Sequence, residues 1–149
     1  MRMLAIFLLG CIVVGLCLPF GTASKANPKC PALEEIKKLP MKGEPGVDAV
    51  YDFYMREAGC DEFLLTKVLS DTRLDSPGCF RPPEFAEGDM ATFLLMDKFG
   101  LGLKDILPPD RHDSVDESGV LAYYNFVRDS SGRVYVQDRV REHMDGKAE

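Results

Sequence analysis

Three stretches of the chain carry apolar residues at intervals of three and four, the spacing of a helix that buries one face. The clearest is 46–59, and the stretches 61–71 and 89–100 repeat the pattern. A shorter helical piece, 103–107, stops before two prolines. The apolar stripe of the first stretch is formed by Val47, Val50, Tyr51, Tyr54 and Ala58. The pattern therefore predicts a mainly α fold.

The segments on either side of these helices have other patterns. Residues 24–45 contain four prolines, which predicts an extended arm with room for one short helical turn near 32–38. Residues 120–138 are rich in β-branched and aromatic residues on both sides of the turn sequence DSSG. That segment is compatible with helix and also with a C-terminal β-hairpin, and the sequence leaves both open.

The first residues form an apolar run. Arg2 precedes "LAIFLLGCIVVGLCLPF", residues 4–20, and the small residues of "GTAS" follow. This order is typical of a secretory signal peptide, so we expect residues 1–23 to be removed and the protein to be secreted into the extracellular space. The run is shorter than the roughly 20 apolar residues of a membrane span, and no later stretch approaches that length, so we expect no membrane span.

Length and charge limit the remaining chain to a few classes of protein. About 125 residues are enough for one domain, 46–149, preceded by the arm 24–45. Without Arg2 the chain has 17 basic and 24 acidic residues, a net charge of −7, which argues against a nucleic-acid partner. The sequence contains no GxSxG, no HExxH and no phosphate-binding glycine loop, so we expect no enzyme. The expected partner is an extracellular protein or the matrix, of unknown identity.

Three cysteines remain after the signal: Cys30, Cys60 and Cys79. In an oxidising compartment this number indicates one disulfide and one cysteine left over, which is available to pair with another chain. The sequence does not decide which pair forms. We favour Cys30 with Cys60, a bond that would join the arm to the helical domain.

Two segments 41 residues apart repeat one pattern. The first is "RLDSPGCFRPPEF", residues 73–85, and the second is "SVDESGVLAYYNF", residues 114–126. Aligning Gly78 with Gly119 pairs Asp75 with Asp116, Phe80 with Leu121, Glu84 with Asn125, and Phe85 with Phe126. An internal repeat is the economical explanation.

These segments resemble the loops of the EF-hand family, in which a helix, a twelve-residue calcium loop and a second helix form a unit that works in pairs. Such a loop places oxygen ligands at its first, third, fifth, seventh, ninth and twelfth positions, with glycine sixth. The resemblance covers residues 61–127 and implies a single domain of paired helix-loop-helix units, with a small β-bridge that buries Phe80 against Leu121. The metal ligands that it implies are Asp75, Cys79 and Glu84 in the first loop and Asp116, Ser118 and Asn125 in the second.

Both loops depart from the family pattern. The first position, normally Asp, is Arg73 in one loop and Ser114 in the other, and Asn125 offers one neutral oxygen where Glu offers two charged ones. The resemblance therefore implies weak calcium binding, with a dissociation constant of roughly 10⁻⁴ to 10⁻³ M. A third frame around Asp129 overlaps the second loop and also fits a plain turn.

The sequence thus favours a secreted, non-catalytic, calcium-binding or matrix-associated protein of EF-hand type. The alternative is a secreted interaction or structural module that does not bind calcium.

Overall fold

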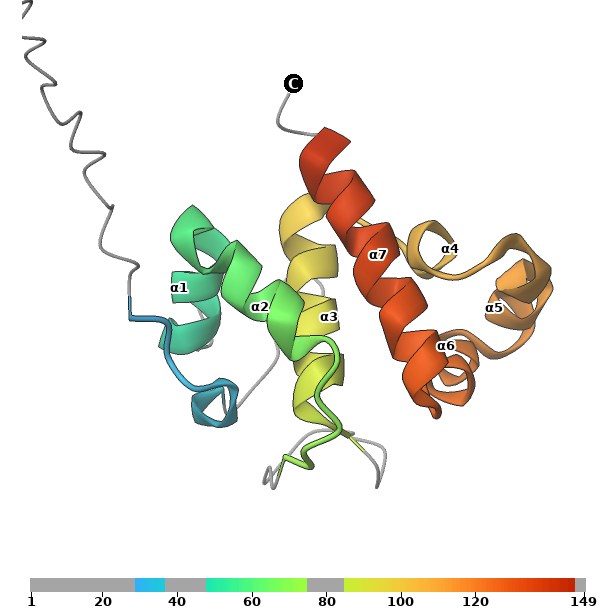
Figure 1. Ribbon diagram of the computed structural model, residues 1–149, viewed down its shortest axis with the longest axis horizontal. Helices are drawn as coiled ribbons and strands as arrows, with labels where there is room; N and C mark the ends of the chain where they lie inside the picture. The colour runs from blue at the N-terminus through green and yellow to red at the C-terminus, as the bar shows by residue number, and fades with distance from the viewer. Residues whose placement is uncertain (1–28, 37–47, 75–84, 147–149) are drawn as a thin grey trace, which may run out of the picture.

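The computed structural model describes residues 29–36, 48–74 and 85–146, and this part of the chain is mainly helical, as the sequence predicts (Figure 1). Helices are confirmed within the predicted stretches 46–59, 61–71, 89–100 and 103–107, as α1, α2, α3 and α4. The first ends earlier than predicted, at Arg56, so Ala58 of the predicted stripe is exposed. The elements in chain order are the 3-10 helix η1 (Leu33–Glu35), α1 (Ala49–Arg56), η2 (Ala58–Cys60), α2 (Asp61–Lys67), α3 (Glu87–Phe99), α4 (Leu103–Ile106), η3 (Pro109–Arg111), α5 (His112–Ser118), α6 (Val120–Phe126) and α7 (Ser130–Gly146).

Helix α3 is the centre of the fold. It lies between α2 and α7 (Figure 1) and also contacts α1 and η1. Its apolar residues Met90, Leu94 and Leu95 have no exposed surface. The helix ends at Gly100, whose φ of +66° is the left-handed conformation that glycine adopts without strain. Helices α1, α2 and α7 therefore all pack against this one helix.

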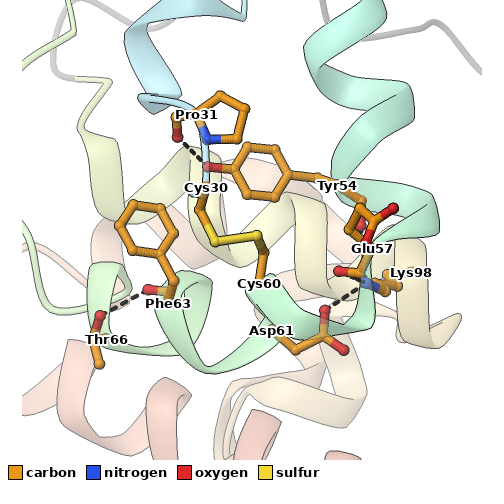
Figure 2. The surroundings of a disulfide bond; sticks show 9 residues. All are labelled: Cys30, Pro31, Tyr54, Glu57, Cys60, Asp61, Phe63, Thr66 and Lys98. Atoms are coloured by element: carbon orange, nitrogen blue, oxygen red, sulfur yellow. Dashed lines mark hydrogen bonds and ion pairs between the residues drawn. A yellow bond between two sulfur atoms is a disulfide. The ribbon is translucent and has the colours of Figure 1, made fainter. Parts of the chain in front are cut away.

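The described part of the N-terminal arm, residues 29–36, belongs to the core. A disulfide joins Cys30 to Cys60, whose Cα atoms lie 5.8 Å apart (Figure 2). Leu33 and Ile36 follow within six residues and are each only 1% exposed. The hydroxyl of Tyr54 on α1 donates a hydrogen bond to the carbonyl of Pro31. The disulfide thus holds a short apolar segment against the helices.

The corner between α1 and α2 is closed by a lysine from α3. The Nζ of Lys98 donates to the backbone carbonyls of Tyr54, at 2.9 Å, and Glu57, at 3.0 Å, and it also pairs with the carboxylate of Asp61 (Figure 2). The Lys98 side chain is only 12% exposed. Carbonyls at the end of a helix lack partners within that helix, and a cation satisfies them well.

The C-terminal segment folds as two helices, so the β-hairpin that the sequence left open is wrong. Helix α6 and helix α7 cover residues 120–126 and 130–146, and the DSSG sequence between them starts α7. The carboxylate of Asp129 accepts the N–H of Gly132 at 2.9 Å and the hydroxyl of Ser131, which caps the first turn. Both bonds lower the pKa of the exposed Asp129 carboxyl, the Ser131 bond most. Burial of Tyr123, Val136 and Val140 outweighs the β-propensity of the segment.

Gly132 allows α7 to approach the end of α6, and we expect Gly132→Ala to destabilise the protein. A Cβ at this position would lie 2.0 Å from the backbone carbonyl oxygen of Phe126, which cannot rotate away. The expected loss of unfolding free energy is about 3 kcal/mol, measured by urea denaturation. Gly146→Ala on the same helix is the control, because a Cβ there meets nothing within 4 Å. Equal urea midpoints for the two variants would contradict this close approach.

Candidate functional site

The predicted metal ligands fall into two groups. Asp75, Cys79 and Glu84 of the first loop lie outside the described residues. Asp116 and Ser118 lie on α5, and Asn125 lies on α6. The calcium site of the first loop therefore stays a prediction.

Residues 114–126 form two short helices that meet at Gly119. The Ser118 hydroxyl donates to the carbonyl of Ser114 at 2.7 Å, and the Gly119 N–H donates to that of Val115 at 2.8 Å, so helical bonding continues through the expected loop. Gly119 then reverses the chain with a φ of +56°. Gly119, which the repeat aligns with Gly78, thus forms a turn between two helices.

Two side chains of this segment lie in different surroundings from those that the EF-hand resemblance implies. Asp116 is 64% exposed and pairs with Lys104 of α4, with 2.6 Å between Nζ and Oδ1. Leu121, expected to be buried, is 57% exposed, because α6 turns Ala122 and Tyr123 toward the core instead. Within residues 29–36, 48–74 and 85–146, no three His, Cys, Asp or Glu side chains are grouped so as to hold a metal ion.

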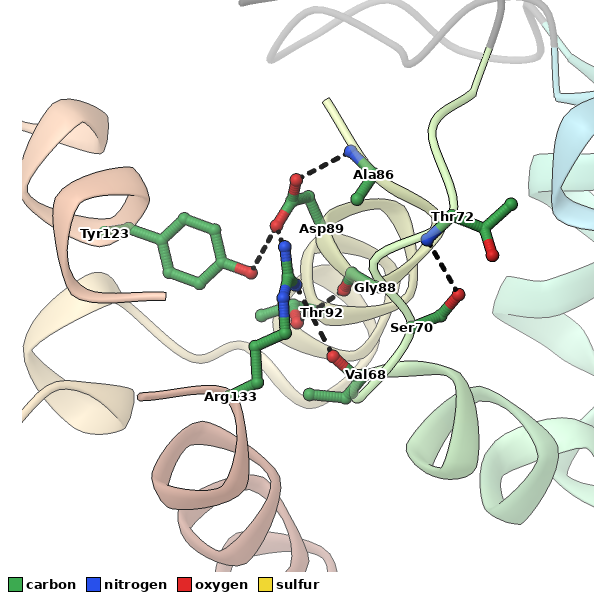
Figure 3. Close-up of polar contacts among 9 residues, drawn as sticks. All are labelled: Val68, Ser70, Thr72, Ala86, Gly88, Asp89, Thr92, Tyr123 and Arg133. Atoms are coloured by element: carbon green, nitrogen blue, oxygen red, sulfur yellow. Dashed lines mark hydrogen bonds and ion pairs between the residues drawn. The ribbon is translucent and has the colours of Figure 1, made fainter. Parts of the chain in front are cut away.

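The main polar cluster of the interior is centred on Asp89, in the first turn of α3 (Figure 3). Its Oδ1 accepts hydrogen bonds from the guanidinium of Arg133, at 3.0 Å, and from the hydroxyl of Tyr123, at 3.1 Å. Its Oδ2 accepts the N–H of Ala86 at 2.8 Å, which caps the helix. The carboxylate is 1% exposed and the Arg133 side chain 11% exposed, so this is a buried ion pair.

Among the described residues, no buried side-chain nitrogen or oxygen lacks a hydrogen-bond partner. Arg133 reaches the carbonyl of Val68 at 3.5 Å, and the Thr92 hydroxyl donates to the carbonyl of Gly88 at 2.8 Å (Figure 3). Burial raises the pKa of Tyr123, and the nearby negative charge of Asp89 raises it further, so the phenol keeps its proton and donates it. A buried network with every member satisfied is rigid.

Gly88 makes room for this network. A Cβ on Gly88 would lie 2.5 Å from the carbonyl oxygens of Val68 and Ser70 and 2.7 Å from Nη1 of Arg133. The N–H of Gly88 donates to the carbonyl of Ser70 at 3.2 Å. The residues after α2 therefore lie directly against the start of α3.

The segment after α2 pairs with the residues that precede α3. Arg73 and Ala86 form an isolated antiparallel β-bridge, with hydrogen bonds from Leu74 N–H to the Phe85 carbonyl at 3.2 Å and from Glu87 N–H to the Thr72 carbonyl at 2.8 Å. This bridge is not the predicted one between Phe80 and Leu121, and Phe80 lies outside the described residues. The bridge fixes where the Arg73 side chain leaves the backbone.

An open cleft of about 720 Å³ lies beside the Asp89 network. Arg133 and Asp89 form part of its wall, together with Ala86 and Val127. Its other described lining residues come from two regions far apart in the sequence: Asp71 and Arg73 after α2, and Leu121, Tyr124, Asn125 and Arg128 on α6 and in the turn that follows it.

The charge of the cleft differs in sign from that of the whole chain. Three arginines and two aspartates line it, a net charge of +1, whereas the chain carries −6. The guanidinium of Arg133 is neutralised by Asp89. Arg73 and Arg128 are exposed, and among the described residues neither forms an ion pair. The cleft therefore presents two cationic groups to solvent.

Three residues of the cleft lining, Arg73, Leu121 and Asn125, stood out in the sequence, but as parts of calcium loops and not of a cleft. Asp89 and Arg133 each follow a glycine, Gly88 and Gly132, and an isolated glycine in or beside a helical pattern is a signal of close packing. That signal marks crowded positions but does not reveal which ones meet.

Comparisons of the chain with protein-family models, with curated proteins and with solved structures find no match. Across the described ranges, no helix is both long enough and apolar enough to cross a membrane.

Proposed function

We propose that the protein is a secreted, non-catalytic helical module that binds a ligand in the cleft between the residues after α2 and helix α6. The observation that carries the proposal is the cleft of about 720 Å³ whose wall is held by the satisfied Asp89–Arg133 ion pair. Ligand sites of this size are usually preformed, with a few fixed polar groups among apolar ones. The wall has this composition, because Tyr124 and Leu121 lie beside the charged side chains.

Two further features support an extracellular role. The apolar run 4–20 is typical of a signal peptide. The disulfide between Cys30 and Cys60 is a bond that persists in oxidising compartments. The two least exposed charged groups of the cleft wall, Asp89 and Arg133, are already bonded to each other, which favours binding over catalysis.

The test begins with expression of the full chain in cultured insect cells. We expect the protein in the medium, with an N-terminus near residue 24 and the Cys30–Cys60 bond, both read by mass spectrometry without reduction. The ¹⁵N-labelled secreted protein is then titrated with a panel of small neutral, cationic and anionic aromatic compounds. We expect at least one class to shift the amide resonances of Arg73, Asn125 and Arg128 together; a panel that leaves all three unmoved contradicts the proposal.

Calcium chloride belongs in the same panel, because the EF-hand resemblance predicts weak calcium binding by the loops at 73–84 and 114–125. Within the described residues, the ligands predicted for the second loop lie on helices α5 and α6, so that prediction rests on the first loop. A melting-temperature shift at millimolar calcium that disappears in Glu84→Ala and persists in Asp116→Ala supports the first loop as the site. Equal melting curves with and without calcium count against it.

A further inference from the structure

The exposed arginines of the cleft specify the chemistry of its ligand. Arg73 is placed by the β-bridge to Ala86, and Arg128 by the turn between α6 and α7, so two separate parts of the fold each bring a guanidinium to one cleft. Guanidinium groups bind carboxylates and phosphates through paired N–H donors. Asn125 adds an amide beside them.

The third guanidinium of the cleft already has a counter-ion. Arg133 is bonded to Asp89 and to the carbonyl of Val68, and its side chain is 11% exposed. Because Asp89 is occupied in turn by Arg133, Tyr123 and Ala86, it does not neutralise Arg73 or Arg128. The buried ion pair therefore holds the wall in place, and the exposed arginines remain available.

The charge balance of the cleft favours a singly charged group. Asp71 lies in the lining with Arg73 and Arg128, and the chain as a whole is acidic. A dianion such as a phosphate monoester would be repelled more strongly by this surrounding charge than a carboxylate would. The lining also includes Leu121, which is 57% exposed, and the ring of Tyr124, both suited to an apolar body.

We infer that the cleft binds a carboxylate carried on an apolar or aromatic body, held by Arg73 and Arg128. The inference rests on the proposed function and names the ligand class of that same site. Two sources carry this chemistry, a small organic acid and the C-terminal carboxylate of a peptide that ends in an apolar residue.

Calorimetric titration of the secreted protein tests the inference with matched probes. Phenylacetate and its neutral counterpart phenylacetamide represent the small acid, N-acetylphenylalanine and its amide represent the peptide end, and phenyl phosphate represents the dianion. We expect each carboxylate to bind at least tenfold more tightly than its amide and more tightly than phenyl phosphate, with weaker binding at high salt. The tighter of the two carboxylates identifies the source.

Substitutions locate the binding within the cleft. Arg73→Gln and Arg128→Gln should each weaken carboxylate binding at least tenfold and leave the circular dichroism spectrum unchanged, because both side chains are exposed. Arg139→Gln is the control: its guanidinium pairs with Glu142 on α7 and lies outside the cleft lining. The inference is overturned if acid and amide bind equally, or if Arg139→Gln weakens carboxylate binding as much as the cleft variants do. Neither result contradicts the proposal that the cleft binds a ligand. A panel in which no compound shifts the cleft amides overturns the inference and the proposed function together.

Discussion

Asp89→Ala is expected to lower the free energy of unfolding by about 3–5 kcal/mol, because it leaves a buried guanidinium without its counter-ion. The carboxylate is 1% exposed and accepts hydrogen bonds from Arg133, Tyr123 and the N–H of Ala86. Domains of this size have total stabilities of about 5–15 kcal/mol, so the change is a large share of the whole. Urea denaturation followed by circular dichroism at the helical wavelengths measures it.

Two further variants test whether the loss of stability comes from leaving a buried charge without its partner. Asp116→Ala removes an exposed carboxylate that pairs with Lys104, and such a pair contributes at most about 1 kcal/mol. Adding Arg133→Met to Asp89→Ala removes the stranded cation as well, and we expect part of the loss to be recovered. An Asp89→Ala protein no less stable than Asp116→Ala would show that the ion pair does not stabilise the fold.

Removing the disulfide is expected to cost about 3–4 kcal/mol. The bond joins residues 30 positions apart, and closing a loop of that length restricts the unfolded chain by about this free energy. Leu33 and Ile36, each 1% exposed, are held near the core by the same bond. The Cys30→Ala, Cys60→Ala double variant should therefore melt well below the natural protein in a thermal scan without reductant.

A reductant provides the internal control for this experiment. It should lower the melting temperature of the natural protein toward that of the double variant and leave the double variant unchanged. Cys79→Ser keeps both bonded cysteines, so it should retain the reductant-dependent shift. Loss of that shift in Cys79→Ser would indicate that Cys30 and Cys60 are not the bonded pair in solution.

The helices that bury a continuous stripe were predictable from the sequence. Spacing of three and four places Tyr54 of α1, Leu64 of α2 and Leu94 of α3 in the core, and all three have no exposed surface. Periodicity succeeded there because burial is a property of one helix face. The burial of Leu121, which the EF-hand resemblance implied, was wrong, because which face of a seven-residue helix turns inward depends on the neighbours that it meets.

The wall of the candidate site was not predictable in the same way. Asp89 has the place of an ordinary first-turn acid, and Arg133 lies 44 residues further on in a helix with many charges. Only tertiary packing brings them together. The roles of Arg73 and Arg128 were not predictable either, because the sequence does not show that these two exposed arginines line the same cleft. In the sequence, Arg73 stood out only because it occupies a loop position where the EF-hand family has Asp.

Lys98 has a consequence for the motions of this fold. A single ammonium group on α3 holds the last carbonyls of α1 and the first turn of α2 at once, through Tyr54, Glu57 and Asp61. Fraying at any one of these helical ends leaves a largely buried ammonium group with fewer partners. Amide protons at this corner should therefore exchange with solvent only when the three helices open as one cooperative unit.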